Sequence, residues 1–291
     1  MANTKDIRAK ISSTIKTQQT TKAMKVVSAA KLRKAQHAIV NARPYANRIY
    51  SVIRKIAVSQ QVEHPLLEKP TVDGKILLVV LTSDRGLCGG FNANVIKHTK
   101  AYYAEKKSQG RTLDIIFIGR KGADFFKKQL GVEGRRTILN LSKEVSYNMA
   151  SKISEELMDA YVQGEYTEIR LIYNEFKSAI SQNVIDERLL PIEIDGKLEA
   201  VEGVSNDFTF EPAASEIIEQ LLMKHFAVQV YRCMQESVAS EHGARMSAME
   251  NATSNAGEMI RSLTLTYNKI RQAAITTELI EITSGAEALQ N

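Results

Sequence analysis

The 291-residue sequence has no Trp, only two Cys and five Pro, and few aromatic residues of any kind. Cys88 and Cys233 lie far apart and outside any metal-binding spacing, so the sequence predicts neither a disulfide framework nor a zinc site. No apolar run approaches the roughly 20 residues that span a bilayer. The first residues, "MANTKDIRAKISS", lack the apolar core of a signal peptide. These absences favour a soluble globular protein in a reducing compartment.

Acidic residues are almost absent from residues 1–60, where Asp6 is the only one. A helix face that is merely solvated would normally mix both signs, so the bias favours an acidic partner: nucleic acid, anionic lipid or an acidic protein surface. The solvated face is the alternative interpretation. The basic residues of this segment are Lys5, Arg8, Lys10, Lys16, Lys22, Lys25, Lys31, Arg33, Lys34, Arg43, Arg48, Arg54 and Lys55.

The N-terminal residues 3–57 are predicted to be helical almost throughout. Small and apolar residues recur there with a four-three spacing, which is typical of a helix that packs on another helix. Pro44 interrupts this pattern and is expected to kink or locally break the helix. The spaced residues are Ile7, Ile11 and Ile15 at the start, followed by Ala35, Ile39, Ala42, Ala46, Ile49, Ile53 and Ile56.

A second long helix is predicted from Pro212, with a four-three register that continues to about Ile280. A single helix over that span would be on the order of 110 Å long at 1.5 Å per residue. A soluble helix of that length needs a partner for its apolar stripe, and the N-terminal helix, running antiparallel, is the obvious candidate. The register contains Ile217, Leu221, Val228, Tyr231, Val238, Met249, Ala252, Ala256, Met259, Leu263, Ile270, Ala273 and Ile280, with polar Lys224, Gln235, His242 and Arg245.

The middle of the chain has the pattern of an α/β domain. Apolar runs at 74–83, 113–119, 135–141 and 166–176 alternate with helical segments at 94–107, 122–130 and 143–163, and 179–194 could add an edge strand. Alternating strands and helices predict a mostly parallel sheet that is covered on both faces. The expected domains are a shaft of 1–58 with 211–291, an α/β domain at 73–195, and a linker at 196–210.

The stretch "LTSDRGLCGGFNANV" (81–95) follows the first predicted strand and raises the question of nucleotide binding. A P-loop requires G-x-x-x-x-G-K-[ST], and a dinucleotide fold requires G-x-G-x-x-G with an acid after the second strand. The spacing here is G-x-x-G-G, and the second strand is followed by Gly119, Arg120 and Lys121. A tight turn or a protein contact is therefore favoured over a phosphate site. No other catalytic or cofactor-binding motif is found.

Several stretches, in order along the chain, resemble the gamma subunit of F-type ATP synthase. They are "KDIRAKISSTIKTQQTTKAMKVVSAAKLRKAQ" at the start, "SDRGLCGGFN", "IGRKG", "SEHGARMSAMENAT" and "YNKIRQAAITTELIEITSGAEAL" near the end. The resemblance covers essentially the whole chain. It implies an antiparallel coiled coil of the terminal helices with a Rossmann-like α/β domain docked at its foot.

The function that this resemblance implies is mechanical, and the chain itself is expected to have no catalytic site and no cofactor. Its partners would be three alpha and three beta subunits around one shaft, the epsilon subunit and the membrane c-ring, with no nucleic acid and no direct membrane insertion. Proton flow would turn the ring and the shaft, and the shaft would drive the catalytic beta subunits. Chloroplast members of this family carry an inserted segment with two closely spaced cysteines for redox control. Cys88 and Cys233 are too far apart to copy it, so a thiol switch is not expected.

Residues carried over from the family fall into two groups. Contacts with the beta subunit are expected at Met24, Lys25, Arg245, Arg271, Gln272, Thr276 and Glu278. Contacts with epsilon and the c-ring are expected at Arg85, Gly86, Gly89, Gly90, Phe208 and Glu211. Arg245 has a second interpretation, in which it is a polar heptad residue bridged within the coil.

The resemblance also implies a location, on the cytoplasmic face of a bacterial energy-transducing membrane, where the chain would be peripheral. Two other functions compete with the rotor. One is a nucleotide-dependent enzyme built on the α/β domain, and the other is a nucleic-acid-binding coiled coil that uses the basic N-terminal helix, whose affinity would fall steeply with salt.

Overall fold

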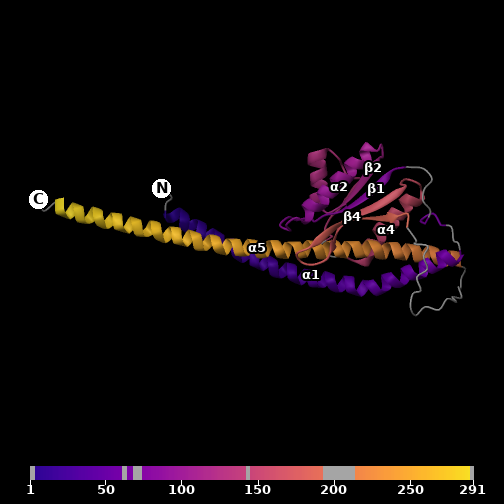
Figure 1. Cartoon of the computed structure of the whole chain (residues 1–291), viewed down its shortest axis with the longest axis horizontal. Helices are drawn as coiled ribbons and strands as arrows, with labels where there is room; N and C mark the ends of the chain where they lie inside the picture. The colour runs from indigo at the N-terminus through magenta and orange to yellow at the C-terminus, as the bar shows by residue number, and fades with distance from the viewer. Residues whose placement is uncertain (1–3, 61–63, 68–73, 142–144, 193–213, 289–291) are drawn as a thin grey trace. The chain divides into compact units, whose positions relative to one another are not determined.

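The computed structural model describes residues 4–60, 64–67, 74–141, 145–192 and 214–288 (Figure 1). The long terminal helices and the alternating middle agree with the sequence prediction, including the edge strand. The elements are α1 (Thr4–Gln60), β1 (Ile76–Leu81), α2 (Phe91–Ser108), β2 (Leu113–Ile118), α3 (Arg120–Phe125) with the π-helical turn η1 (Phe126–Leu130), β3 (Arg136–Ile138), α4 (Tyr147–Val162), β4 (Glu168–Phe176), β5 (Gln182–Leu190) and α5 (Ala214–Ala288).

The five strands form one sheet in the order β3-β2-β1-β4-β5. β1 pairs in parallel with β2 on one side and β4 on the other, and β3 extends the parallel part beyond β2. β5 turns back from β4 and pairs antiparallel to it at the edge. The strand order therefore reverses between β1 and β4. In open parallel sheets, the carboxyl ends of the strands at such a point border the usual ligand crevice.

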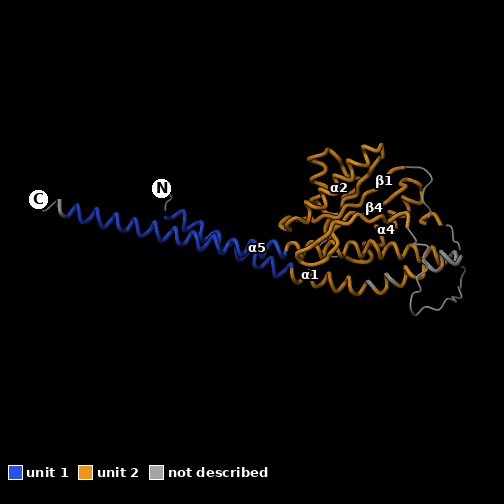
Figure 2. The backbone as a smooth tube through the Cα atoms, viewed as in Figure 1, with its two compact units in different colours: residues 1–28, 246–291 blue, residues 29–245 orange. Residues whose placement is uncertain are grey.

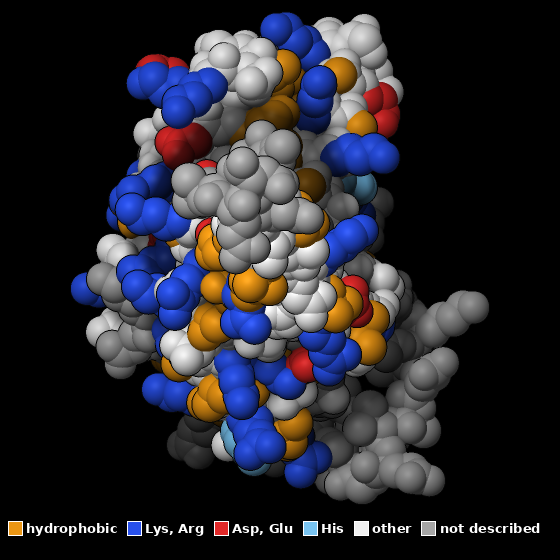
Figure 3. All heavy atoms as spheres, turned by 90° about the vertical axis from the view of Figure 1, so that its left-hand side faces the viewer, with side chains coloured by type: hydrophobic (Ala, Val, Ile, Leu, Met, Phe, Trp, Pro, Cys, Tyr) orange, Lys and Arg blue, Asp and Glu red, His pale blue; other side chains and the backbone are white. Residues whose placement is uncertain are grey.

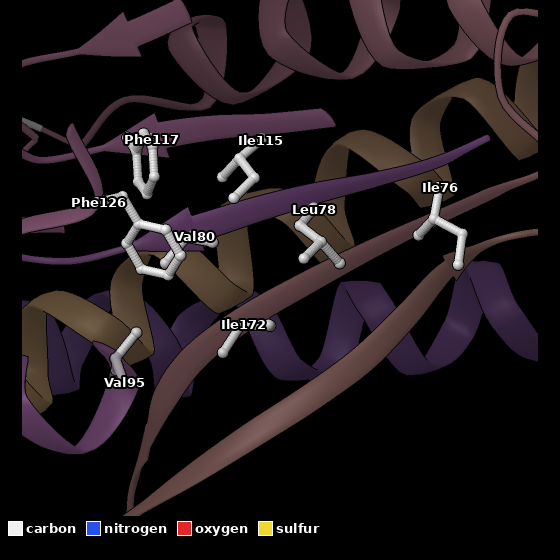
Figure 4. Packing of buried hydrophobic residues seen from close by; sticks show 8 residues of the cluster. All are labelled: Ile76, Leu78, Val80, Val95, Ile115, Phe117, Phe126 and Ile172. Carbon is white, nitrogen blue, oxygen red and sulfur yellow. The ribbon is translucent and has the colours of Figure 1, made fainter. Parts of the chain in front are cut away.

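The centre of the sheet is buried on both faces, which explains why β1 is continuously apolar. Every residue of β1 is buried. On one face, alternate residues of β1 and β2 pack with Val95 of α2 and Phe126 of η1 (Figure 4). The rings of Phe117 and Phe126 lie 5.3 Å apart at this core. Because side chains alternate along a strand, the remaining strand residues face the side that α4 and α5 cover (Figure 1).

The chain divides into two compact units, and both long helices contribute to each of them (Figure 2). Unit 1 comprises residues 1–28 and 246–291, and unit 2 comprises residues 29–245. The α/β sheet thus shares its unit with much of α1 and α5. The predicted linker at 196–210 lies outside the described residues.

In unit 1 the two helices run antiparallel and meet through small and polar side chains. The hydroxyls of Thr21 and Thr253 are 2.7 Å apart, and Thr14 Oγ1 lies 4.0 Å from Met259 Sδ. The predicted stripe shifts here, because Thr14 faces α5 whereas Ile15 is exposed. Ile7 is buried as expected. The helices approach closely at Gly257, where a Cβ would lie 3.0 Å from the amide nitrogen of Gln18.

In unit 2 the helix α5 is enclosed on all sides, which a single apolar stripe did not predict. All residues from Cys233 to Arg245 are buried, although several of them are polar. On one side the ring of His225 stacks near Tyr50 of α1, with centroids 5.4 Å apart. Gln235 Nε2 donates to Val145 O, beside α4, at 3.3 Å. Both cysteines, Cys88 and Cys233, are free and buried.

Two helix predictions were wrong in detail. A kink or a local break was expected at Pro44, and the break does not occur, because α1 continues through this residue. Proline removes the hydrogen bond to the carbonyl of residue 40, and because Pro44 and Val40 are both exposed, water can satisfy that carbonyl. The α5 seam also ends earlier than Ile280, since every residue from 271 to 286 is exposed. Thr14 lies opposite Met259, so α1, which is described from Thr4, reaches only to about Ile270.

Gly119 should be the position in the α/β domain that tolerates a side chain least. Its φ is +106°, and a Cβ there would lie 2.0 Å from Thr82 O. We expect Gly119→Ala to lower the free energy of unfolding by about 3 kcal/mol or more, because backbone strain and a clash with backbone add together. Urea denaturation of the purified chain measures this.

Gly110→Ala is the matched control, because its φ is +78° but nothing lies within 4 Å of the added Cβ. It should cost only about 1 kcal/mol, from strain alone. If the two variants lost the same free energy of unfolding, the clash of the added Cβ with Thr82 would contribute nothing to the cost at Gly119.

Candidate functional site

The glycine loop, residues 83–92, joins the carboxyl end of β1 to α2 and is held by its own polar side chains. Asn92 Oδ1 accepts from Ser83 N at 2.9 Å, and Asn92 Nδ2 donates to Ser83 Oγ at 2.8 Å. Gly89 has a φ of +54° and Leu87 a φ of +62°, so the loop uses the left-handed region twice. The glycine thus permits a tight turn. The Ser83 and Asn92 side chains bond to each other and do not form an open cradle for phosphate.

Asp84 ties this loop to the ends of β2 and β3. Its Oδ1 accepts from Arg120 N at 3.1 Å and its Oδ2 accepts from Asn140 N at 2.8 Å. Nearby, Gly122 N donates to Thr82 Oγ1 at 3.0 Å. The stretch "IGRKG" therefore anchors the glycine loop, and the backbone groups at its start are engaged within the protein.

Helix α5 fills the crevice where a doubly wound sheet would bind a ligand. Ser240 Oγ donates to Asn174 O at 3.0 Å, at the carboxyl end of β4, and Asn174 Nδ2 donates to Phe91 O at 3.1 Å, at the end of the glycine loop. A Cβ on Gly243 would lie 3.2 Å from the ring of Phe176, so the helix backbone approaches closely here. The edge of the sheet is thus closed by the chain itself. The two described hollows lie elsewhere, beside β5 and between α4 and α5.

A group of buried ionisable side chains on α5 supports the glycine loop. Arg245 Nη1 donates to Glu241 Oε1 at 2.7 Å, and its Nη2 lies 3.5 Å from Arg85 O and 3.4 Å from Gly86 O. Burial raises the pKa of Glu241 above its usual value, although Arg245 opposes the shift. The Arg245 side chain is only 10% exposed. Its guanidinium is turned into unit 2, which agrees with a residue bridged within the protein.

Comparison with known proteins identifies the family. A family model described as ATP synthase matches residues 3–289. Over the full length of both chains, the sequence is 56% identical to the ATP synthase gamma chain of Bdellovibrio bacteriovorus and 46% identical to that of Geotalea uraniireducens. The chain belongs to the ATP synthase gamma-chain family. Neither alternative function receives support from these matches.

Solved structures agree with this family. A chain from the central stalk and c-ring of the Tetrahymena thermophila mitochondrial ATP synthase is 28% identical, with a TM-score of 0.59 over 80% of this chain and 98% of that one. A chain from the F1 and c-ring assembly of the Euglena gracilis enzyme, at 22% identity, has a TM-score of 0.68 over 98% of this chain and 94% of that one. The latter likeness establishes the shared fold.

Two residues that the family resemblance assigns to a beta-subunit contact, Met24 and Lys25, lie on α1 in unit 1 and are partly exposed. Lys25 forms an ion pair with Glu250 of α5, so its charge already has a partner within the chain. Most of the described basic residues around it on α1 are exposed, and Lys and Arg are prominent on the face shown in Figure 3. The basic surface inferred from the sequence therefore exists, on a helix that is paired along its other side.

The second set of residues assigned to the beta subunit lies on the exposed end of α5. Arg271, Gln272, Thr276 and Glu278 are all exposed, and no described residue of α1 lies opposite them. At 1.5 Å per residue, Arg271 is about 30 Å along α5 from Glu250, the partner of Lys25. The structure therefore separates these residues from Met24 and Lys25, and any partner would have to meet them at two levels. Contact with the beta subunit stays a prediction for both groups.

The structure brings together the four described residues that were assigned to epsilon and the c-ring. Arg85, Gly89 and Gly90 are exposed and Gly86 is partly exposed, all in the glycine loop. Their contacts with those subunits stay a prediction. The other two residues of that group, Phe208 and Glu211, lie outside the described residues.

Sequence reasoning missed the residues through which α5 is bound to the sheet. Ser240 and Asn174 form one polar contact between α5 and β4. Arg232, Glu187 and Tyr173 form a second polar group, between α5 and the strands β4 and β5. The signal for them is weak but present, since Glu187 and Tyr173 occur inside predicted strands and Arg232 follows Tyr231 of the helical register. Their partners could not be read from the sequence because they come from elements far apart in it.

Within the described part of the chain, no group of three or more His, Cys, Asp or Glu side chains is placed to hold a metal ion. None of the helices there is both long and apolar enough to cross a membrane.

The two buried histidines should make the protein less stable in mild acid. Burial lowers the pKa of His225 and His242 to about 4, with help from Arg232 for the first and from Arg245 and Lys31 for the second. In the unfolded chain these two histidines bind protons near pH 6.5, whereas in the folded protein they stay neutral down to about pH 4. The folding stability present above pH 6.5 is therefore lost as the pH falls through 4. We expect His225→Gln with His242→Gln to reduce this loss between pH 7 and pH 4 by about 3 kcal/mol for each histidine, on the order of 6 kcal/mol for both.

Urea denaturation of both proteins across this pH range is the measurement, with exposed His37→Gln as the control. Buried Glu236 and Glu241, whose raised pKa values act in the opposite direction, are common to all variants and cancel in the comparison. If the double variant lost as much stability as the parent in acid, the histidines would not be neutral in the folded state.

Proposed function

We propose that this chain is the rotor of the central stalk of an ATP synthase. It transmits torque between a membrane-embedded c-ring and the catalytic beta subunits, and it is not a catalyst by itself. The observation that carries this function is the full-length identity to bacterial gamma chains together with a sheet whose ligand crevice is filled by α5. A chain with its own nucleotide chemistry would need that crevice open.

The structure of unit 1 supports a shaft role. Two antiparallel helices meet through short side chains, and one of them continues alone with an exposed apolar surface that includes Ile275, Leu279 and Ile282. An exposed helix with several large apolar residues is typical of a segment that a partner surrounds. This agrees with turning inside an apolar collar of alpha and beta subunits. A helix end that is merely frayed would not need these residues.

The basic face of α1 supports the same function. Exposed charges attract an acidic partner over a long range, and each pair contributes at most about 1 kcal/mol, so the contact steers without locking. We assign Met24 and Lys25 to the beta-subunit lever on this basis, and Arg245 to an indirect role through the glycine loop. The chain lies at the membrane periphery, on the cytoplasmic face of a bacterial energy-transducing membrane, with epsilon and the c-ring at the glycine loop.

Reconstitution tests this function directly. The purified chain is mixed with separately purified alpha and beta subunits, and ATP hydrolysis and subunit ratio are followed. We expect one copy to join three alpha and three beta subunits and to raise ATP hydrolysis well above that of alpha and beta alone. Failure to join the ring, with saturable nucleotide binding or salt-sensitive DNA binding by the isolated chain, would instead support an alternative.

The exposed end of α5 should affect activity without affecting the fold. Arg271→Glu reverses a charge on an exposed position, and we expect ATP hydrolysis by the reconstituted complex to fall by about threefold to tenfold through a disrupted contact with the beta subunit. Circular dichroism and urea denaturation should be unchanged. Arg261→Glu, on the same helix and also exposed, is the control. An equal fall in ATP hydrolysis for this variant would show that the net charge of the helix matters and not a contact made by Arg271.

A further inference from the structure

A polar network joins α5 to the edge strand β5 in unit 2. Arg232 Nη2 donates to both carboxylate oxygens of Glu187, at 2.7 Å and 2.8 Å. Tyr173 of β4 donates its hydroxyl to Glu187 Oε2 at 2.9 Å. The carboxylate of Glu187 on β5 therefore accepts hydrogen bonds both from helix α5 and from the neighbouring strand β4.

The same guanidinium is held on its own helix by residues on either side. Its Nε donates to Gln229 Oε1 at 2.9 Å, and its Nη1 lies 3.2 Å from Glu236 Oε1. Positions 229, 232 and 236 are three and four residues apart and share one face of α5. The side chains of Arg232 and Glu187 are each 24% exposed, so salt screens this pair less than a surface pair. The network therefore fixes which face of α5 meets β5.

The apolar contacts around this network cannot fix that orientation by themselves. Val230, Cys233 and Met234 are fully buried, but the hydrophobic effect that favours their burial is non-directional. Charge-assisted hydrogen bonds from a planar guanidinium have a defined geometry and are lost when the helix rotates. Arg232 and its partners therefore resist rotation of α5 about its own axis next to β5, as the Ser240 and Arg245 hydrogen bonds do further along the helix.

We propose that Arg232, Glu187 and Tyr173 form a torsional lock that makes α5 and the α/β sheet turn as one body. The inference rests on the proposed rotor function, in which torque enters through the α/β domain and leaves along α5. The three residues are positioning residues, because they hold the shaft against the sheet and touch no reacting group. Loss of the lock lets α5 slip under load while the unloaded complex still turns over.

Asp186 offers a matched control on the same strand. It precedes Glu187, its Oδ1 accepts from Arg170 Nε at 2.6 Å, and its side chain is 15% exposed. This pair joins β4 to β5 and does not involve α5. Because the two carboxylates differ in their partner but little in burial or bond length, Asp186→Asn removes a comparable ion pair from the sheet and leaves the lock intact.

The experiment uses the complete ATP synthase in inverted membrane vesicles, with the subunit ratio checked for every variant. ATP hydrolysis is measured with the proton gradient collapsed by an uncoupler, and ATP-driven proton pumping is measured without it. For Glu187→Gln and Arg232→Gln we expect uncoupled hydrolysis within about twofold of the parent, while protons pumped per ATP fall by about threefold or more, as for loss of one partly buried, charge-assisted pair. Asp186→Asn should keep the parental ratio.

Two further variants keep the test decisive if Arg232→Gln does not assemble. Arg232→Lys retains the charge without the planar guanidinium that also bonds to Gln229 and Glu236, and it should give an intermediate pumping ratio. Tyr173→Phe removes one donor and should give a smaller loss. Unchanged protons per ATP in every assembled lock variant would overturn the proposal, and so would an equal loss in Asp186→Asn. If the parent complex itself failed to pump, the rotor function and not the lock would be refuted.

Discussion

A helix of 75 residues cannot bury its own apolar surface, and most features of this protein follow from where α5 finds cover. Between Cys233 and Arg245 it is enclosed by α1, α4 and the sheet. In unit 1 it is covered along one side only, through a seam of threonines and small residues. From residue 271 onward no described part of the chain covers it. The side chains of α5 change accordingly: buried ion pairs in the enclosed segment, hydroxyl groups in the seam of unit 1, and a mixture of exposed polar and apolar residues from residue 271 onward.

The enclosed segment also decides what the sheet can do. Its strand order is that of a nucleotide-binding topology, yet the crevice at the carboxyl edge holds Ser240 and Gly243 of α5. The loop that might have cradled phosphate instead closes on Ser83 and Asn92. Topology did not confer the function that it usually accompanies. The same edge that receives ligands in other proteins receives a helix here.

The order and type of the elements could be predicted from the sequence because periodicity reports burial directly. The alternating middle gave the sheet with its edge strand, and the four-three spacing around Ile39 and Ile53 gave the covered side of α1. Burial of α5 on every side could not be predicted, because its enclosed segment contains Glu236, Ser237, Ser240 and Glu241, which resemble a solvated face until their partners are known. Pro44 was misjudged for a related reason, since the sequence does not say that the orphaned carbonyl faces water.

The candidate site followed a similar rule. The glycine loop was identified from its spacing, and the family resemblance assigned its role, but the arrangement that supports it depends on Arg245 and Asp84 contacting segments far away in the sequence. Single residues of a motif predict a turn or a cap. They do not predict which distant backbone groups will be bonded, because that depends on how whole elements come together.

The enclosure of α5 also bears on how the protein is made. A ribosome releases the strands of the sheet long before residues 225–245, so the nascent α/β domain emerges with its second apolar face open and with α1 lacking a partner. Contacts between segments so distant in sequence form slowly, and open apolar faces promote aggregation meanwhile. The α/β domain can therefore complete its core only after residues 225–245 of α5 have been translated. Docking of this helix is then the last step in the folding of the chain.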